Sequence, residues 1–134
     1  MKLRDYKMIE KAIESDGTLI RYIGNEIHDE NLVKKAVSQN GMSLQYVSGH
    51  QTPEVIKAAI SQNVMAIQYA RFFCIDFCDI VLKSDKTAMK YVNPDFFSKE
   101  IIAYLLSFDD DELVKLIPLK RLDKFIQKEV LNLK

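Results

Sequence analysis

Four short segments of the chain share a pattern that ends in tyrosine and recurs at nearly constant spacing. The successive tyrosines are 24, 23 and 22 residues apart. They are Tyr22, Tyr46, Tyr69 and Tyr91. Self-similarity at this period is typical of stacked supersecondary units, in which each unit covers its neighbour. The repeat therefore constrains the fold much more tightly than it constrains the activity.

Other positions recur at fixed distances before each tyrosine. The polar residues six positions before it are Asp16, Asn40, Asn63 and Asp85. The small residues ten positions before it, where two elements are expected to approach closely, are Ala12, Ala36, Ala59 and Val81. Ile56, Ala59 and Ile60 have the i, i+3, i+4 spacing that places side chains on one face of a helix. Each unit is therefore predicted to begin with an amphipathic helix, which a turn joins to a short second helix.

Capping residues and glycines mark the predicted helix ends. Thr52-Pro53-Glu54 combines an N-cap hydroxyl, a proline at the first helical position and an acid in the first turn. The N-caps predicted for other helices are Asp29, Asp76 and Ser98. Gly17 and Gly41 are expected to end first helices in the left-handed conformation. The repeated Asp or Asn is expected either to tolerate that conformation or to cap the second helix.

A fifth, weaker copy has Leu116 in the place of the tyrosine and Asp110 six residues before it. Residues 122–134 then carry an apolar stripe, which predicts a capping helix. We therefore predict an all-α fold, a right-handed, α-solenoid-like stack of about five short helix-turn-helix units followed by that cap. The predicted units are residues 3–28, 29–51, 52–75, 76–97 and 98–121, all within a single domain spanning residues 1–134.

The composition is that expected of one compact domain. The chain is 48% hydrophobic with only 4 Gly and 3 Pro, which leaves little linker material for disorder. No apolar run approaches the ~20 residues of a membrane span, and residues 1–5 lack a signal-peptide apolar stretch. We therefore expect a cytoplasmic protein with no membrane contact. Cys74 and Cys78 are expected to be reduced thiols in the core.

Charge is balanced along the chain, with 19 basic and 19 acidic residues, which argues against a dedicated nucleic-acid binder. The residue before each tyrosine, or before Leu116, is polar or basic and is expected to point outward, while Ile20 and Tyr22 point inward. These ladder residues are Arg21, Gln45, Gln68, Lys90 and Lys115. They form either the solvated side of the second helices or a recognition face for an acidic partner or a nucleic-acid backbone.

Common catalytic motifs do not occur in the sequence. It has no glycine-rich phosphate loop, no Gly-x-Ser-x-Gly turn, no His-Glu-x-x-His helix and no Cys-x-x-Cys pair. His28 and His50 fall in predicted connections and are expected to be exposed loop residues. A tyrosine repeated in every unit is expected at a half-buried packing seam, since a catalytic group is needed only once. The acidic residues 109–112 lack the ligand periodicity of a calcium loop. We therefore expect no catalytic residue, cofactor or metal.

The connection after the third unit is unusually aromatic because it contains Phe72 and Phe73. If these rings fold inward, they close a shortened connection. If one stays outside, it forms an apolar anchor for self-association or for a protein partner. Phe96 and Phe97 leave the same two alternatives open.

Residues 33–47 carry the pattern apolar-x-x-Ala-apolar-x-x-Asn-Gly-x-x-Leu-x-Tyr-Val, followed by Thr52-Pro53-Glu54. In this pattern the chain resembles the short helical repeat family catalogued as domain of unknown function 4116, with four units over most of residues 8–107. Val64 and Lys86 depart from it where glycine is usual. Similar repeats occur as tandem arrays in bacterial, phage-encoded and protist proteins. The resemblance implies an interaction scaffold and supplies no catalytic residues.

The function expected from these observations is binding. The chain is predicted to be a non-enzymatic protein–protein interaction module, an adaptor or inhibitor, and the family's distribution suggests a counter-defence role in a phage or mobile element. The alternative is a nucleic-acid-contacting module that uses the basic ladder residues Arg21, Lys90 and Lys115. The sequence leaves open which protein is bound and whether the chain self-associates.

Overall fold

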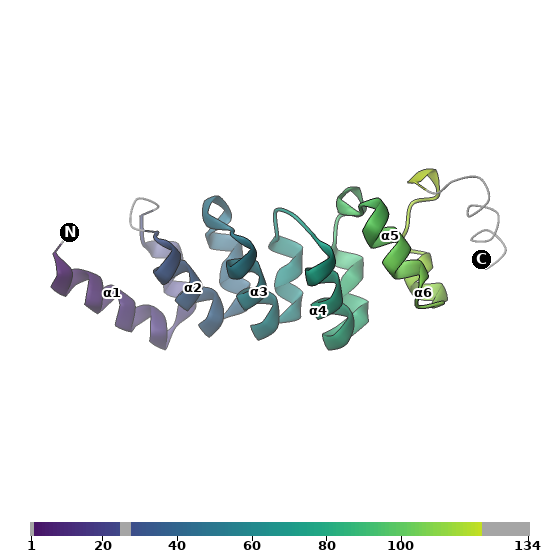
Figure 1. Ribbon diagram of the computed structural model, residues 1–134. Helices are drawn as coiled ribbons and strands as arrows, with labels where there is room; N and C mark the ends of the chain where they lie inside the picture. Colours follow the sequence, from purple (N-terminus) through teal and green to yellow (C-terminus); the bar gives the residue numbers. More distant parts are fainter. Residues whose placement is uncertain (1, 25–27, 122–134) are drawn as a thin grey trace. The chain divides into compact units, whose positions relative to one another are not determined.

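The computed structural model describes residues 2–24 and 28–121, and the regular structure in these two ranges is entirely helical (Figure 1). The predicted all-α class is therefore confirmed. The chain divides into two compact units, Met1–Arg71 and Phe72–Lys134, which are described separately below. The capping helix predicted for residues 122–134 lies outside the described ranges.

The first unit contains three copies of the repeat, each made of an α-helix and a six-residue 3-10 helix. The α-helices are α1 (Leu3–Ser15), α2 (Glu30–Gln39) and α3 (Pro53–Gln62), and the 3-10 helices are η1 (Gly17–Tyr22), η3 (Gly41–Tyr46) and η5 (Val64–Tyr69). A short turn, η4 (Ser48–His50), follows η3. Helix α2 packs against α1 and α3, while η3 packs against η1 and η5. The unit therefore consists of a row of α-helices beside a row of 3-10 helices.

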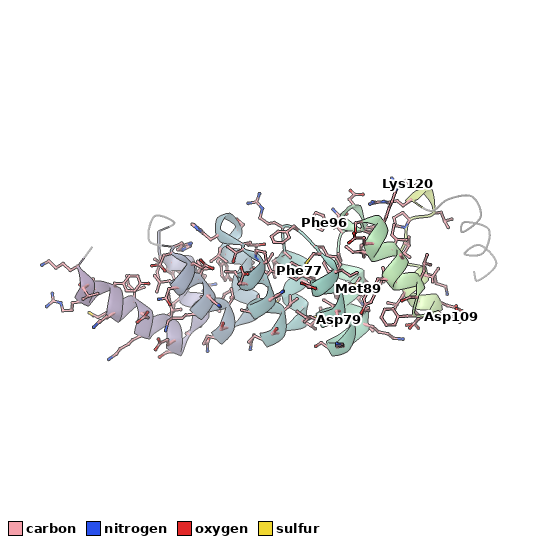
Figure 2. All side chains as sticks on the ribbon, viewed as in Figure 1. Phe77, Asp79, Met89, Phe96, Asp109 and Lys120 are labelled. Carbon is pink, nitrogen blue, oxygen red and sulfur yellow. The ribbon has the colours of Figure 1, made fainter. Side chains whose placement is uncertain are left out.

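The second unit contains the fourth and fifth copies. Its elements are α4 (Ile75–Asp85), η6 (Lys86–Tyr91), η7 (Pro94–Phe96), α5 (Lys99–Leu106), α6 (Asp111–Val114) and η8 (Leu119–Arg121). Helix α4 packs against η6 and α5, and α5 packs against α6. Phe77 on α4 and Met89 on η6 are labelled in Figure 2, and both side chains are fully buried. An aromatic and a thioether side chain thus belong to the core of this unit.

The repeated Asp or Asn caps the element that follows it in all five copies. Its side-chain oxygen accepts a hydrogen bond from the amide two residues ahead, over donor–acceptor distances of 2.9–3.1 Å. The capping residues are Asp16, Asn40, Asn63, Asp85 and Asp110. Each has extended backbone angles, so the capping alternative is confirmed. After the first four caps, six residues form a 3-10 helix with i→i+3 hydrogen bonds.

The prediction that Gly17 and Gly41 adopt the left-handed conformation is wrong. No described glycine has a positive φ. A Cβ at Gly17 would collide with the carbonyl oxygen of Ala36, and one at Gly41 would collide with that of Ala59. Glycine is therefore required because the next repeat's α-helix approaches too closely for a side chain. Ala36 and Ala59, two of the small residues predicted to lie at close approaches, supply the other side of these contacts.

A glutamine completes each of these close approaches. The Gly17 amide donates to Oε1 of Gln39 over 2.6 Å, and the Gly41 amide donates to Oε1 of Gln62 over 2.5 Å. Each glutamine stands directly before the Asn cap of the next repeat. We call this glycine–glutamine bond, together with the glycine–alanine contact, the glycine clamp. It occurs twice in the first unit.

The predicted N-caps are confirmed at Thr52, Asp29 and Ser98, whose side chains accept from Val55, Leu32 and Ile101 amides, respectively. Asp76 was predicted to cap α4, and this prediction is wrong. The helix begins at Ile75, its N-cap is Cys74, and Asp76 lies in its first turn. An acid in the first turn still interacts favourably with the helix dipole.

Candidate interaction surfaces

The ladder residues of the first unit lie on the row of 3-10 helices. Arg21, Gln45 and Gln68 are all exposed, as expected of a solvated side. The adjacent Tyr46 and Tyr69 are half-buried, in agreement with the predicted packing seam. Tyr22, the tyrosine of the first repeat, is instead exposed.

Tyr22 is 71% exposed, so the prediction that it points inward is wrong, whereas Ile20 is fully buried as predicted. The reason is its place in the unit. Tyr22 belongs to η1, which packs against η3 alone in the row, while η3 has a 3-10 helix on each side. The row therefore ends in a large exposed aromatic side chain.

Arg21 holds two tyrosines of neighbouring repeats together. Its guanidinium carbon lies 4.6 Å from the ring centroid of Tyr22 and 5.7 Å from that of Tyr46. The guanidinium also donates hydrogen bonds to both hydroxyls, with Nη1 3.4 Å from the Tyr46 oxygen. These bonds, that to Tyr46 first, raise the pKa of Arg21 and favour its charged form. The result is a cationic, aromatic corner on the surface.

The glutamines in the ladder make local hydrogen bonds. Gln45 donates to the carbonyl of Met42, and Gln68 donates to that of Met65, both over 3.0 Å. Each amide therefore lies on its own 3-10 helix. Since both side chains are neutral, the ladder of the first unit has one positive charge, at Arg21.

The second unit carries the basic members Lys90 and Lys115. Lys90 lies with its ammonium 5.2 Å from the Tyr91 ring, an arrangement similar to that of Arg21 and Tyr22. Tyr91 is 42% exposed. Lys115 is exposed at the C-terminal end of α6, where a cation is favourable for the helix dipole.

Phe72 and Phe73 pack within the second unit. Phe72 lies 5.6 Å from Phe77 between ring centroids, and Phe73 lies 6.4 Å from Phe77 and 6.3 Å from Phe97. Phe77 and Phe97 are fully buried, while Phe72, Phe73 and Phe96 are partly exposed. This geometry favours the alternative in which the aromatic connection is closed inward.

The prediction that His28 is an exposed loop residue is wrong. Its side chain is only 7% exposed, and Nε2 lies 3.2 Å from the carbonyl oxygen of Ile20 and 3.0 Å from that of Ile23. Nε2 must carry the proton, because both of its neighbours are acceptors. The ring of partly exposed His50 meets it edge-on at 5.5 Å. His28 thus bridges the end of η1 to the following segment, a packing role that its loop position in the sequence did not indicate.

The prediction of a core thiol is confirmed at Cys78, which is fully buried, whereas Cys74 is partly exposed. Burial raises the pKa of Cys78 to about 12, so this thiol is protonated at neutral pH. Within the described ranges, no three His, Cys, Asp or Glu side chains are placed to hold a metal ion. Of the acidic residues 109–112, Asp110 serves as a cap and Asp109 has a φ of 51°.

None of the helices in residues 2–24 and 28–121 is both long and apolar enough to cross a membrane.

A family model described as "Domain of unknown function (DUF4116)" matches residues 5–50 and 29–73. Together these two matches cover 69 of the 134 residues. No curated protein and no solved structure matches the chain.

Proposed function

The chain belongs to the DUF4116 family, whose description assigns no activity, and we propose from its surfaces that it is a non-enzymatic module that binds a protein partner. It would act as an adaptor or as an inhibitor. The setting that we propose is the cytoplasm, with counter-defence in a phage or mobile element as the specific role. The predicted right-handed, α-solenoid-like stack of five repeats is part of this proposal.

The observation that carries the proposal is the corner formed by Arg21, Tyr22 and Tyr46. Tyrosine and arginine, together with tryptophan, are enriched among the residues that dominate binding energy at protein interfaces. Here the arginine is already held by two rings and two hydroxyls, so it loses little conformational freedom when a partner binds. Tyr22 offers a ring that is 71% exposed beside this fixed charge.

The contacts of the corner also favour a partner with carboxylates over a long phosphate backbone. Arg21 supplies one cation, and the next two ladder positions of the first unit are the neutral Gln45 and Gln68. A carboxylate can bind one guanidinium in a bidentate manner, whereas a nucleic-acid backbone is usually bound by several cations. An acidic segment of a protein is therefore the ligand class that we propose for this surface.

Partner capture with matched variants tests the proposal. We expect wild-type protein to retain a specific host protein that Tyr22→Ala loses, with affinity for the purified partner reduced about 30-fold, as for a typical interface anchor. Lys34→Ala is the control, because Lys34 is exposed on α2, outside the row of 3-10 helices. Equal loss in the control, or equal retention by Tyr22→Ala, would contradict a binding role for the corner.

A second measurement tests the alternative that the chain binds a nucleic acid. A labelled single-stranded oligonucleotide is titrated with wild-type protein at several salt concentrations and with the triple variant Arg21→Glu, Lys90→Glu, Lys115→Glu. We expect no saturable binding. Binding that weakens steeply with salt and disappears in the triple variant would replace the protein partner with a nucleic acid.

A further inference from the structure

A surface pocket of about 230 Å³ lies in the second unit, between the fourth and fifth copies of the repeat. The residues that line it are Lys86, Thr87, Lys90, Glu112, Leu113 and Leu116. The first three belong to η6, while Glu112 and Leu113 belong to α6. The lining therefore joins a 3-10 helix to the element that follows the cap of the next repeat.

The same place between the first and second repeats is occupied by a tyrosine. Tyr46 stands in the repeat position of Leu116, and Arg21 stands in that of Lys90. The Tyr46 ring lies under the Arg21 guanidinium, whose Nη1 is 3.4 Å from the tyrosine hydroxyl. One repeat thus supplies a cation, and the next supplies a phenol that packs against it.

The fifth copy keeps the cation of this arrangement and lacks the phenol. Leu116 has no ring to extend toward η6, and the pocket lies beside it. Lys90 contacts the Tyr91 ring, but no hydrogen bond or ion pair joins its ammonium to another described residue. The Lys86 ammonium, in contrast, is paired with Asp110 at 2.9 Å. Lys90 is therefore the cation available to a group that enters the pocket.

We propose that this pocket binds a tyrosine side chain of a protein partner, which takes the place that Tyr46 occupies between the first two repeats. The inference rests on the proposed function, because it assumes a protein ligand. Leu113 and Leu116 supply an apolar surface for the ring. Lys90 supplies a cation for the ring face and a donor for the phenolic oxygen. The pocket is smaller than typical drug-sized sites, which suits one side chain rather than a cofactor.

A fragment titration tests the pocket without any knowledge of the partner. N-acetyl-tyrosinamide is titrated into ¹⁵N-labelled full-length protein, with N-acetyl-alaninamide as the ligand control. We expect saturable amide shifts at the pocket residues with a Kd on the order of 1 mM, as for a small fragment. Shifts that do not saturate, or that equal those caused by the alanine compound, would overturn the proposal.

Two variants make the test specific. Leu116→Tyr is expected to fill the pocket from within and to weaken tyrosinamide binding at least about tenfold while the circular dichroism spectrum stays helical. Lys90→Met, which changes an exposed side chain, is expected to weaken it about threefold through loss of the cation. Unchanged binding in both variants would refute the pocket as the site.

The source of the tyrosine is tested separately. If Leu116→Tyr weakens capture of the partner identified through Tyr22, the occupant is the partner's tyrosine, as proposed. Capture that Leu116→Tyr leaves intact would overturn the pocket assignment while the proposed function stands. Concentration-dependent light scattering that both Leu116→Tyr and Tyr22→Ala abolish would assign the occupant to a second copy and overturn the partner assignment.

Discussion

The two units join their successive repeats through the same first position, that of Gly41 and Lys86, but with different partners and different chemistry. In the first unit the Gly41 amide donates to Gln62, and the Gly41 backbone lies against Ala59. In the second unit Lys86 takes the position of the glycine and reaches Asp110 with its ammonium. A buried, neutral backbone contact thus corresponds to an exposed ion pair.

The difference shows how much sequence variation each joint allows. The glycine clamp needs a residue without Cβ and an amide side chain at a fixed offset, so few substitutions preserve it. A lysine–aspartate pair needs only two long or flexible side chains that can reach each other, and exposed pairs of this kind contribute little to stability. The first unit should therefore depend on its joint residues more strongly than the second unit does.

The largest effect is expected for Gly41→Ala. The new Cβ would collide with backbone of the neighbouring α3, which cannot move as a flexible side chain can, and we expect a loss of about 3 kcal/mol in the free energy of unfolding. Urea denaturation followed by circular dichroism measures the loss. Gly49→Ala is the control, because nothing lies within 4 Å of a Cβ placed there. Equal stability of the two variants would refute the clamp.

A smaller loss is expected for Gln62→Ala, which removes the acceptor of the Gly41 amide. Because Gly41 is buried, its amide would lack a protein acceptor, at a cost of about 1 kcal/mol. The control is Gln45→Ala, since Gln45 bonds only a carbonyl of its own 3-10 helix. Hydrogen exchange should show faster exchange of the Gly41 amide in Gln62→Ala alone, and protection that stays unchanged would argue against the bond.

A gain in stability is expected for Ser43→Ala in the first unit. Ser43 is fully buried, and its hydroxyl has no hydrogen-bond partner in the described structure. The third and fourth copies have Ala66 and Ala88 at this position, both fully buried. Removing the hydroxyl should stabilise the protein by about 0.5 kcal/mol or more, measured as a higher urea midpoint. A lower midpoint would show that the hydroxyl is satisfied.

The smallest effect is expected at the joint of the second unit, in a double-mutant cycle of Lys86→Met and Asp110→Asn. Asparagine can still cap α6, so the cycle isolates the ion pair. Its coupling energy should be small at pH 7 and should fall with added salt. A coupling as large as the effect of Gln62→Ala would remove the contrast between the two units.

The same cycle has a defined pH dependence. The hydrogen bond from Lys86 lowers the pKa of Asp110 in the folded state. The ion pair therefore stabilises the protein at pH values above the ordinary aspartate pKa of about 3.9, and this stabilisation is lost as the pH falls through the lower folded value. The glycine clamp has no titrating group. The effect of Gln62→Ala should consequently persist in acid.

The sequence predicted the elements that depend on local chemistry. Asp or Asn at a fixed offset can cap the following helix by itself, and Thr52 with Pro53 marks a helix start, so these features were visible without a structure. The predicted start of α4 was misplaced by two residues. Its actual N-cap, Cys74, makes no side-chain hydrogen bond to the helix, so no capping residue in the sequence marks this start.

Features that depend on contacts between repeats were less predictable. The requirement for glycine at Gly41 comes from a carbonyl of the next repeat, and the burial of His28 comes from two carbonyls of η1. The glutamine that completes the clamp could have been found, since Gln39 and Gln62 both precede the repeated asparagine. The pocket beside Leu116 was marked by the missing fifth tyrosine, but only the structure shows that an opening lies there.

The missing Cβ at Gly17 and Gly41 has a geometric consequence for recognition. With backbone resting directly on backbone, the step from one repeat to the next cannot shorten further, and the bond to glutamine opposes its lengthening. Because the same clamp joins both pairs of repeats, we expect successive ladder positions of the first unit to lie at nearly equal intervals. Under the proposed binding function, a ligand that contacts more than one of them would need matching groups at that interval, so the clamp would select partners by spacing as well as by chemistry.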